Sequence, residues 1–168
     1  MSCDEIDIAF STLDIKDGIG PASSLFMDPK TPRPIAGEGQ GLVKIHSFGL
    51  NRMDLMQREG QYNVPPQAGK TLGVEFSGWI EELGPGDHGD FKVGDEVFGL
   101  AYGGAYAEYL ASATKMLIHK PKEIPWPMAA GIPEVSANSI IIYHCSQQLP
   151  DLDHSNSSTP SRRLFQAR

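Results

Sequence analysis

The chain has 168 residues, 40% of them hydrophobic, which is enough for one globular domain and some additional segment. Its formal net charge of −7 argues against binding to nucleic acid, and no run of about 18 apolar residues predicts a membrane span. The acidic residues Asp4, Glu5 and Asp7 are unlike the start of a signal peptide, and two distant cysteines, Cys3 and Cys145, do not form a disulfide framework. We therefore expect a cytoplasmic protein without nucleic-acid or membrane partners.

Glycine and proline are abundant, which favours short strands joined by turns. The first strand is predicted at residues 12–16, and a Pro/Gly-punctuated connection follows over 18–41. Residues 42–48 alternate between apolar and polar side chains, with Val43 and Ile45 on one face, and so predict a half-buried strand.

A short helix is predicted after this strand. Asn51 is a good N-cap, Asp54 stands three residues later in capping-box position, and Gly60 can end the helix. A proline-bearing loop over 62–69 follows.

Several more strands are predicted further along the chain. They span 73–83, 97–102, 105–111 and 116–120, with Gly103 and Gly104 as a hairpin loop, and a helix opens at 128–131. The fold class is therefore mainly β, a small and partly open β-barrel with short helices. All 18 glycines lie at or before Gly131, and residues 136–168 form a polar tail that we expect to be disordered.

Two apparent sites do not meet the requirements of their chemistry. Gly84, Gly86 and Gly89 spell G-x-G-x-x-G, but the residues that follow predict no helix whose N-terminus could hold a pyrophosphate, so we interpret them as a turn. The five histidines are dispersed and no C-x-x-C is present, so we expect no metal site.

Several ordered motifs over residues 12–135 resemble a known family. The segment 49–62 (GLNRMDLMQREGQY) is similar to the signature of quinone oxidoreductases in the medium-chain dehydrogenase/reductase superfamily, nearest to the p53-inducible quinone reductase-like subgroup. The pattern continues in 72–78 (LGVEFSG), 91–100 (FKVGDEVFGL), 103–109 (GGAYAEY) and 129–134 (AAGIPE). The resemblance implies a GroES-like N-terminal domain over residues 12–135.

The resemblance also implies a zinc-free site, because Asn51 and Val74 stand where the zinc alcohol dehydrogenases of the superfamily have a cysteine and a histidine. It implies that Asn51 lies near the nicotinamide and bonds the cofactor or the substrate carbonyl, that Asp54 orders this loop, and that Tyr62 lines a quinone pocket. The plain alternatives are an N-cap for Asn51, helix capping for Asp54 and loop packing for Tyr62.

After Val135 the family pattern stops. The family continues into a Rossmann domain that binds NADP(H), whereas residues 136–168 contain no glycine for such a fingerprint. We expect a truncated, alternatively spliced or misread product that is catalytically incomplete alone and leaves an apolar cleft wall bare.

Three hypotheses follow for the function. The first is part of an NADPH-dependent quinone or enone oxidoreductase, with a quinone-like small molecule as its ligand. The second is a non-catalytic module that pairs with a full-length reductase in a homo- or hetero-oligomer. The third is a barrel domain without chemistry of its own.

Overall fold

A computed structural model of the chain describes residues 9–16 and 18–137. Of the predicted tail over 136–168, residues 138–168, with His144, Cys145 and His154, lie outside the described residues, as does Cys3. Ser136 and Ala137 are described and are helical, so the disorder expected for them is wrong. The elements in chain order are β1 (Ala9–Ile15), the 3-10 helix η1 (Ala22–Ser24), β2 (Leu25–Pro32), β3 (Gln40–Phe48), α1 (Arg52–Arg58), β4 (Glu75–Leu83), β5 (Glu96–Leu100), β6 (Tyr109–Ala113), the 3-10 helix η2 (Thr114–Met116), β7 (Leu117–His119) and α2 (Trp126–Ala130).

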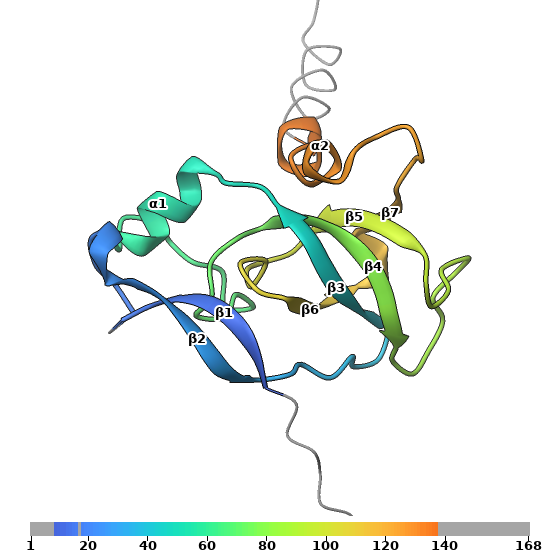
Figure 1. Ribbon diagram of the computed structural model, residues 1–168, viewed down its shortest axis with the longest axis horizontal. Coiled ribbons are helices and arrows are strands. Elements are labelled where there is room, and N and C mark those ends of the chain that lie inside the picture. The colour runs from blue at the N-terminus through green and yellow to red at the C-terminus, as the bar shows by residue number, and fades with distance from the viewer. Residues whose placement is uncertain (1–8, 17, 138–168) are drawn as a thin grey trace, which may run out of the picture.

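Two antiparallel sheets make up the body of the domain. The larger has the strand order β6-β3-β4-β5-β7, and the smaller pairs β1 with β2 (Figure 1). The segment before β6 joins them, because the Leu13 N–H donates to the Tyr106 carbonyl at 2.8 Å. The sheets do not close into a full barrel, so the predicted mainly β, partly open barrel with short helices is confirmed.

The core lies on the inner face of the larger sheet. Val43, Phe76, Ile80 and Val97 have no exposed surface and pack together with Leu117. Val43 is buried and Ile45 packs against this cluster, whereas His46 is exposed, so the two faces predicted for residues 43–46 are confirmed. Leu42 departs from the predicted alternation, because it is buried as well.

Two of the predicted strand connections are wrong. The stretch 18–41 contains a strand, β2, which pairs with β1 despite Pro29 and Pro32, because an edge strand tolerates proline. Gly103 and Gly104 are not a hairpin loop, because β6 pairs with β3 at the opposite edge of the sheet from β5 and β7.

At residues 103–106 the chain crosses from β5 toward β3, because its backbone N–H groups bond to residues 71–73 and not to a hairpin partner. The Gly104 N–H donates to the Thr71 carbonyl at 2.9 Å, and the Ala105 N–H donates to the Gly73 carbonyl at 3.0 Å. Gly104 has a φ of 92°, a left-handed conformation that suits glycine and turns the chain toward β1 and β3.

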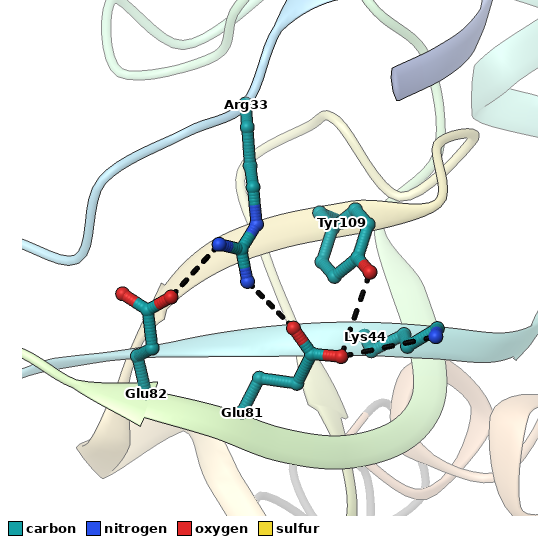
Figure 2. Close-up of polar contacts among 5 residues, drawn as sticks. All are labelled: Arg33, Lys44, Glu81, Glu82 and Tyr109. Carbon is teal, nitrogen blue, oxygen red and sulfur yellow. Dashed lines mark hydrogen bonds and ion pairs between the residues drawn. The ribbon is translucent and has the colours of Figure 1, made fainter. Parts of the chain in front are cut away.

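A cluster of charges holds the connection after β2 against the larger sheet. The Arg33 guanidinium pairs with both Glu81 and Glu82 of β4, and lies 4.8 Å from the centre of the Tyr109 ring (Figure 2). Lys44 of β3 also faces Glu81, at 3.8 Å. These contacts attach the connection to β4 and β6 and so position the start of β3.

Helix α2 lies against the larger sheet, and Ser77 of β4 anchors its first residue. The Ser77 hydroxyl donates to the Trp126 carbonyl at 2.8 Å, which fixes the start of the helix. The helix begins two residues earlier than the sequence indicates, since Pro127 is tolerated in a first turn.

Gly78 allows the close approach of β3 and β4, because a Cβ atom at this position would collide with the Lys44 carbonyl. We expect Gly78→Ala to lower the free energy of unfolding by at least about 2 kcal/mol, as measured by urea denaturation. Gly69→Ala is the matched control, since its added Cβ meets no heavy atom within 4 Å. Equal stability of the two variants would contradict the packing argument.

Candidate functional site

Three strand ends meet at one end of the larger sheet. Phe48, the last residue of β3, pairs with Phe76 of β4, while Glu75, the first residue of β4, pairs with Leu100 at the end of β5. Helix α1 starts four residues after β3 ends. The sheet therefore places the first turn of α1 next to Glu75, and this end of the sheet is the candidate site.

Asn51 lies at this end of the sheet, immediately before α1. Its backbone N–H donates to Asp54 Oδ2 at 2.8 Å, which confirms the predicted N-cap and capping-box arrangement. Its side-chain Nδ2 donates to Glu75 Oε1 at 2.9 Å. The backbone of Asn51 is thus held by Asp54 and its half-buried side-chain amide by Glu75, so the residue does more than cap the helix.

Asp54 is 1% exposed and turns its carboxylate inward. Besides the Asn51 N–H, Oδ2 accepts a hydrogen bond from the Tyr106 hydroxyl at 2.9 Å. Within the described residues its other oxygen, Oδ1, has no hydrogen-bond partner. These buried contacts suit a residue that fixes the first turn of α1 rather than one that contacts a ligand.

Tyr106 is buried, and its ring lies 4.6 Å from the ring of Phe48. Burial raises the pKa of the Tyr106 phenol above the ordinary tyrosine value, and the hydrogen bond to Asp54 and the nearby charges of Asp54 and Glu75 raise it further. Tyr106 is not among the site residues that the sequence predicts. No local signal could have revealed the contact, because 52 positions separate Tyr106 from Asp54.

Glu75 is not among the site residues that the sequence predicts. Its side chain is buried, yet both carboxylate oxygens are engaged: Oε1 by Asn51 Nδ2 and Oε2 by the Glu134 N–H at 3.0 Å. Its backbone carbonyl accepts the Gly49 N–H at 3.1 Å. Glu75 therefore connects the segment before α1 with the segment that follows α2.

Tyr62 lies elsewhere. It lines a cavity of about 630 Å³ between the β1–β2 end and the C-terminal end of α1, together with Ile15, Ile19, Gln57, Val64 and Lys70. Neither Asn51 nor Asp54 lines this cavity. The structure brings Asn51 and Asp54 together and leaves Tyr62 in a separate hollow.

The G-x-G-x-x-G pattern forms a turn, and the described histidines gather into no metal site. Residues 84–95 are loop and turn, with positive φ at Gly86, Gly89 and Gly94, so the G-x-G-x-x-G pattern opens no helix and the predicted turn is confirmed. Over residues 9–16 and 18–137, no three His, Cys, Asp or Glu side chains gather in a group that could hold a metal ion. Over the same residues, no helix is long and apolar enough to cross a membrane.

Exposed apolar side chains belong to the segments around Glu75. Leu50 is 78% exposed, and Phe48, Tyr102 and Val135 are also exposed. The apolar cleft wall stays a prediction, because exposed apolar side chains also occur elsewhere, as at Ile35 and Met128.

Curated relatives match the same part of the chain. A quinone oxidoreductase from Sus scrofa is 34% identical over 108 residues, which cover 62% of this chain and 32% of that protein. A synaptic vesicle membrane protein VAT-1 homolog from Danio rerio is 33% identical over 116 residues, covering 69% of this chain and 24% of that protein. The chain spans about a third of the length of the quinone oxidoreductases that it matches.

Solved structures share the fold. The quinone oxidoreductase of Coxiella burnetii superimposes with a TM-score of 0.72 at 27% identity, over 82% of this chain and 45% of that chain. A mycobacterial protein complexed with NADPH superimposes with a TM-score of 0.60 at 28% identity, over 70% of this chain and 34% of that chain.

The Tyr106 hydroxyl is a testable support of this site. We expect Tyr106→Phe to lower the free energy of unfolding by about 2 kcal/mol, because a buried carboxylate loses a hydrogen-bond donor. Tyr102→Phe, which alters an exposed tyrosine, is the control. Urea denaturation at pH 7 measures both, and equal midpoints would show that the hydroxyl does not stabilise Asp54.

The same hydroxyl predicts a pH dependence. Because the folded state raises the pKa of Tyr106, folding favours the neutral phenol. Its stabilisation is complete below about pH 10, the ordinary tyrosine pKa, and is lost as the pH rises through the folded-state pKa. The stability difference between wild type and Tyr106→Phe should therefore shrink above pH 10, and a constant difference up to the unfolding limit would contradict this assignment.

The sequence profile of the alcohol dehydrogenase GroES-like domain matches residues 37–122, just over half of the chain. This stretch includes β3, α1, β4 and β5, and therefore Asn51, Asp54 and Glu75. Its relatives and structural neighbours include quinone oxidoreductases of the medium-chain dehydrogenase/reductase superfamily. The chain belongs to the alcohol dehydrogenase GroES-like domain family.

Proposed function

We propose that this chain supplies the substrate-side half of a site that transfers a hydride from NADPH to a quinone or a related enone. The observation that carries the proposal is the placement of Asn51, whose half-buried amide is held by Glu75 at the end of the larger sheet, beside exposed apolar side chains. An apolar surface with a few fixed polar groups is typical of sites that bind small planar ligands. The quinone oxidoreductases among the relatives support this chemistry.

In the proposed reaction, NADPH would supply a hydride to the quinone ring and a solvent proton would complete the hydroquinone, with NADP⁺ as the other product. Negative charge grows on a quinone oxygen as the hydride arrives, and a side-chain N–H placed there, such as that of Asn51, stabilises it. A quinone is already a strong electrophile, so a metal ion is not required to polarise it. Asp54 would contribute by fixing α1, and Tyr62 by lining a separate hollow that receives part of a larger ligand.

The dinucleotide needs contacts that the described residues do not supply. NADPH affinity comes mainly from phosphate contacts at a glycine-rich turn that opens a helix, and residues 9–16 and 18–137 contain no strand–turn–helix unit of this kind. We propose that the GroES-like domain spans residues 12–135 and that the described residues by themselves are incomplete as an enzyme. Cytoplasmic localisation and a zinc-free site belong to the same proposal.

Titration of the purified chain with NADPH, followed by nicotinamide fluorescence, tests this division. We expect no saturation at micromolar NADPH, because the phosphates lack a site. Saturable micromolar binding by this chain alone would contradict the incomplete-enzyme proposal.

A separate titration tests the substrate side. Duroquinone is a suitable probe, because its ring carbons are all substituted and resist addition of the Cys3 and Cys145 thiols. We expect it to shift the NMR resonances of Leu50, Asn51 and Tyr102, and to shift those of Leu50 and Tyr102 less in Asn51→Ala. Perturbations confined to the hollow around Tyr62, or none at all, would exclude the proposed face. Co-purification with a full-length reductase without any quinone response would instead favour the non-catalytic module.

A further inference from the structure

We infer that Glu75 is a positioning residue, which sets the hydrogen-bonding direction of the Asn51 amide and couples it to the segment at 132–137. This inference rests on the proposed function for its ligand. The coupling itself is a property of the chain and can be tested without any ligand.

The first step concerns the two ends of the Asn51 amide. A carboxylate only accepts hydrogen bonds, so the end of the amide that faces Glu75 Oε1 at 2.9 Å must be the NH₂ group. The other end lies on the capping-box side, where the Asp54 N–H donates to the Asn51 backbone carbonyl at 3.1 Å. The Glu75 carboxylate therefore sets the orientation of the amide, because a flip would place the amide oxygen against a carboxylate oxygen.

The second step is what this orientation leaves for a ligand. The NH₂ group carries two hydrogens, and Glu75 uses one of them. Within the described residues, no second acceptor bonds Nδ2, and Asn51 is only half-buried. Asn51 therefore offers a donor rather than an acceptor, and the ligand group that it fits is a carbonyl oxygen, as in a quinone, an enone or a carboxamide.

The third step is the coupling to the segment after α2. Residues 133–137 are helical, and the Glu134 N–H donates to the second oxygen of Glu75 at 3.0 Å. One buried carboxylate thus accepts from Asn51 with one oxygen and from the start of this helical segment with the other. A movement of residues 133–137 would therefore shift Glu75 and change its hydrogen bond with the Asn51 amide.

Gly49 shows how closely the carboxylate is enclosed. A Cβ atom at Gly49 would collide with Oε1 and the adjacent carbons of Glu75. Glu75 itself is 3% exposed. The carboxylate therefore has little room for another rotamer, which is what a positioning role requires.

Glu75→Gln is the decisive change, because glutamine keeps the size of the side chain but has one oxygen for two donors. Two NMR signals report the outcome: the Asn51 side-chain amide, identified by its loss in Asn51→Ala, and the Glu134 backbone amide. We expect both to shift together in Glu75→Gln, with solvent exchange of the Asn51 amide hydrogens about tenfold faster. Glu123→Gln, at an exposed glutamate, is the matched control. Signals and exchange in Glu75→Gln that match this control would overturn the inference.

A charge-based rescue keeps the test decisive if Glu75→Gln folds poorly. Asn51→Asp places two carboxylates against each other and should lower the Tm by at least about 5 °C. The double variant that combines Asn51→Asp with Glu75→Gln should recover part of that loss, because the introduced glutamine amide can donate to the introduced aspartate carboxylate. No recovery would mean that the two side chains do not act as a pair, and the inference would fail.

The duroquinone titration then separates this inference from the proposed function. A wild-type chain that responds to duroquinone, with a response at least about tenfold weaker in Glu75→Gln, supports both. If the wild-type chain does not respond to duroquinone but Glu75→Gln still shifts both NMR signals, the proposed substrate is contradicted and the positioning role is supported.

Discussion

The arrangement of the candidate site depends on one buried carboxylate. Removing the Glu75 charge from water costs several kcal/mol, and this cost is offset only if both of its oxygens find donors. The donors are Asn51 Nδ2, from the segment before α1, and the Glu134 N–H, from the segment after α2. Because neither donor can move away without leaving the charge unpaired, three parts of the chain that are distant in sequence stay together.

A second buried carboxylate has a different task. Asp54 accepts from the Asn51 N–H and the Tyr106 hydroxyl, and it fixes the first turn of α1 against the segment that precedes β6. Asn51 is the residue shared by the two carboxylates, since its backbone serves Asp54 and its side chain serves Glu75. This division leaves Asn51 half-buried and rigid, which is the state that a hydrogen-bond donor for a reacting carbonyl requires.

Exposed apolar side chains and a separate hollow surround the Asn51 donor. Leu50, Phe48, Tyr102 and Val135, each within two residues of Asn51, Glu134 or the end of β3 or β5, leave apolar surface exposed. The hollow that Tyr62 lines is separate from Asn51, so a ligand that used both would have to extend across α1.

Local features of the sequence were enough to predict several elements. The alternation of residues 42–48 identified β3, because one face of that strand packs against the core. The Asn51–Asp54 spacing identified the start of α1, because a helix N-terminus presents unpaired N–H groups that nearby side chains satisfy. The quinone oxidoreductase motifs also led to the correct family and fold, since they span the barrel from β3 onward.

Tertiary structure alone decided the rest. The pairing of β2 with β1 overrides two prolines, and β6 joins β3 instead of β5 because residues 104–106 bond to the segment 71–73. The contacts of Glu75 with Asn51 and Glu134 and of Tyr106 with Asp54 join residues 24, 59 and 52 positions apart. A local pattern reports only the backbone preferences and burial of its own segment, whereas these bonds form because burial leaves polar groups no partner except one another.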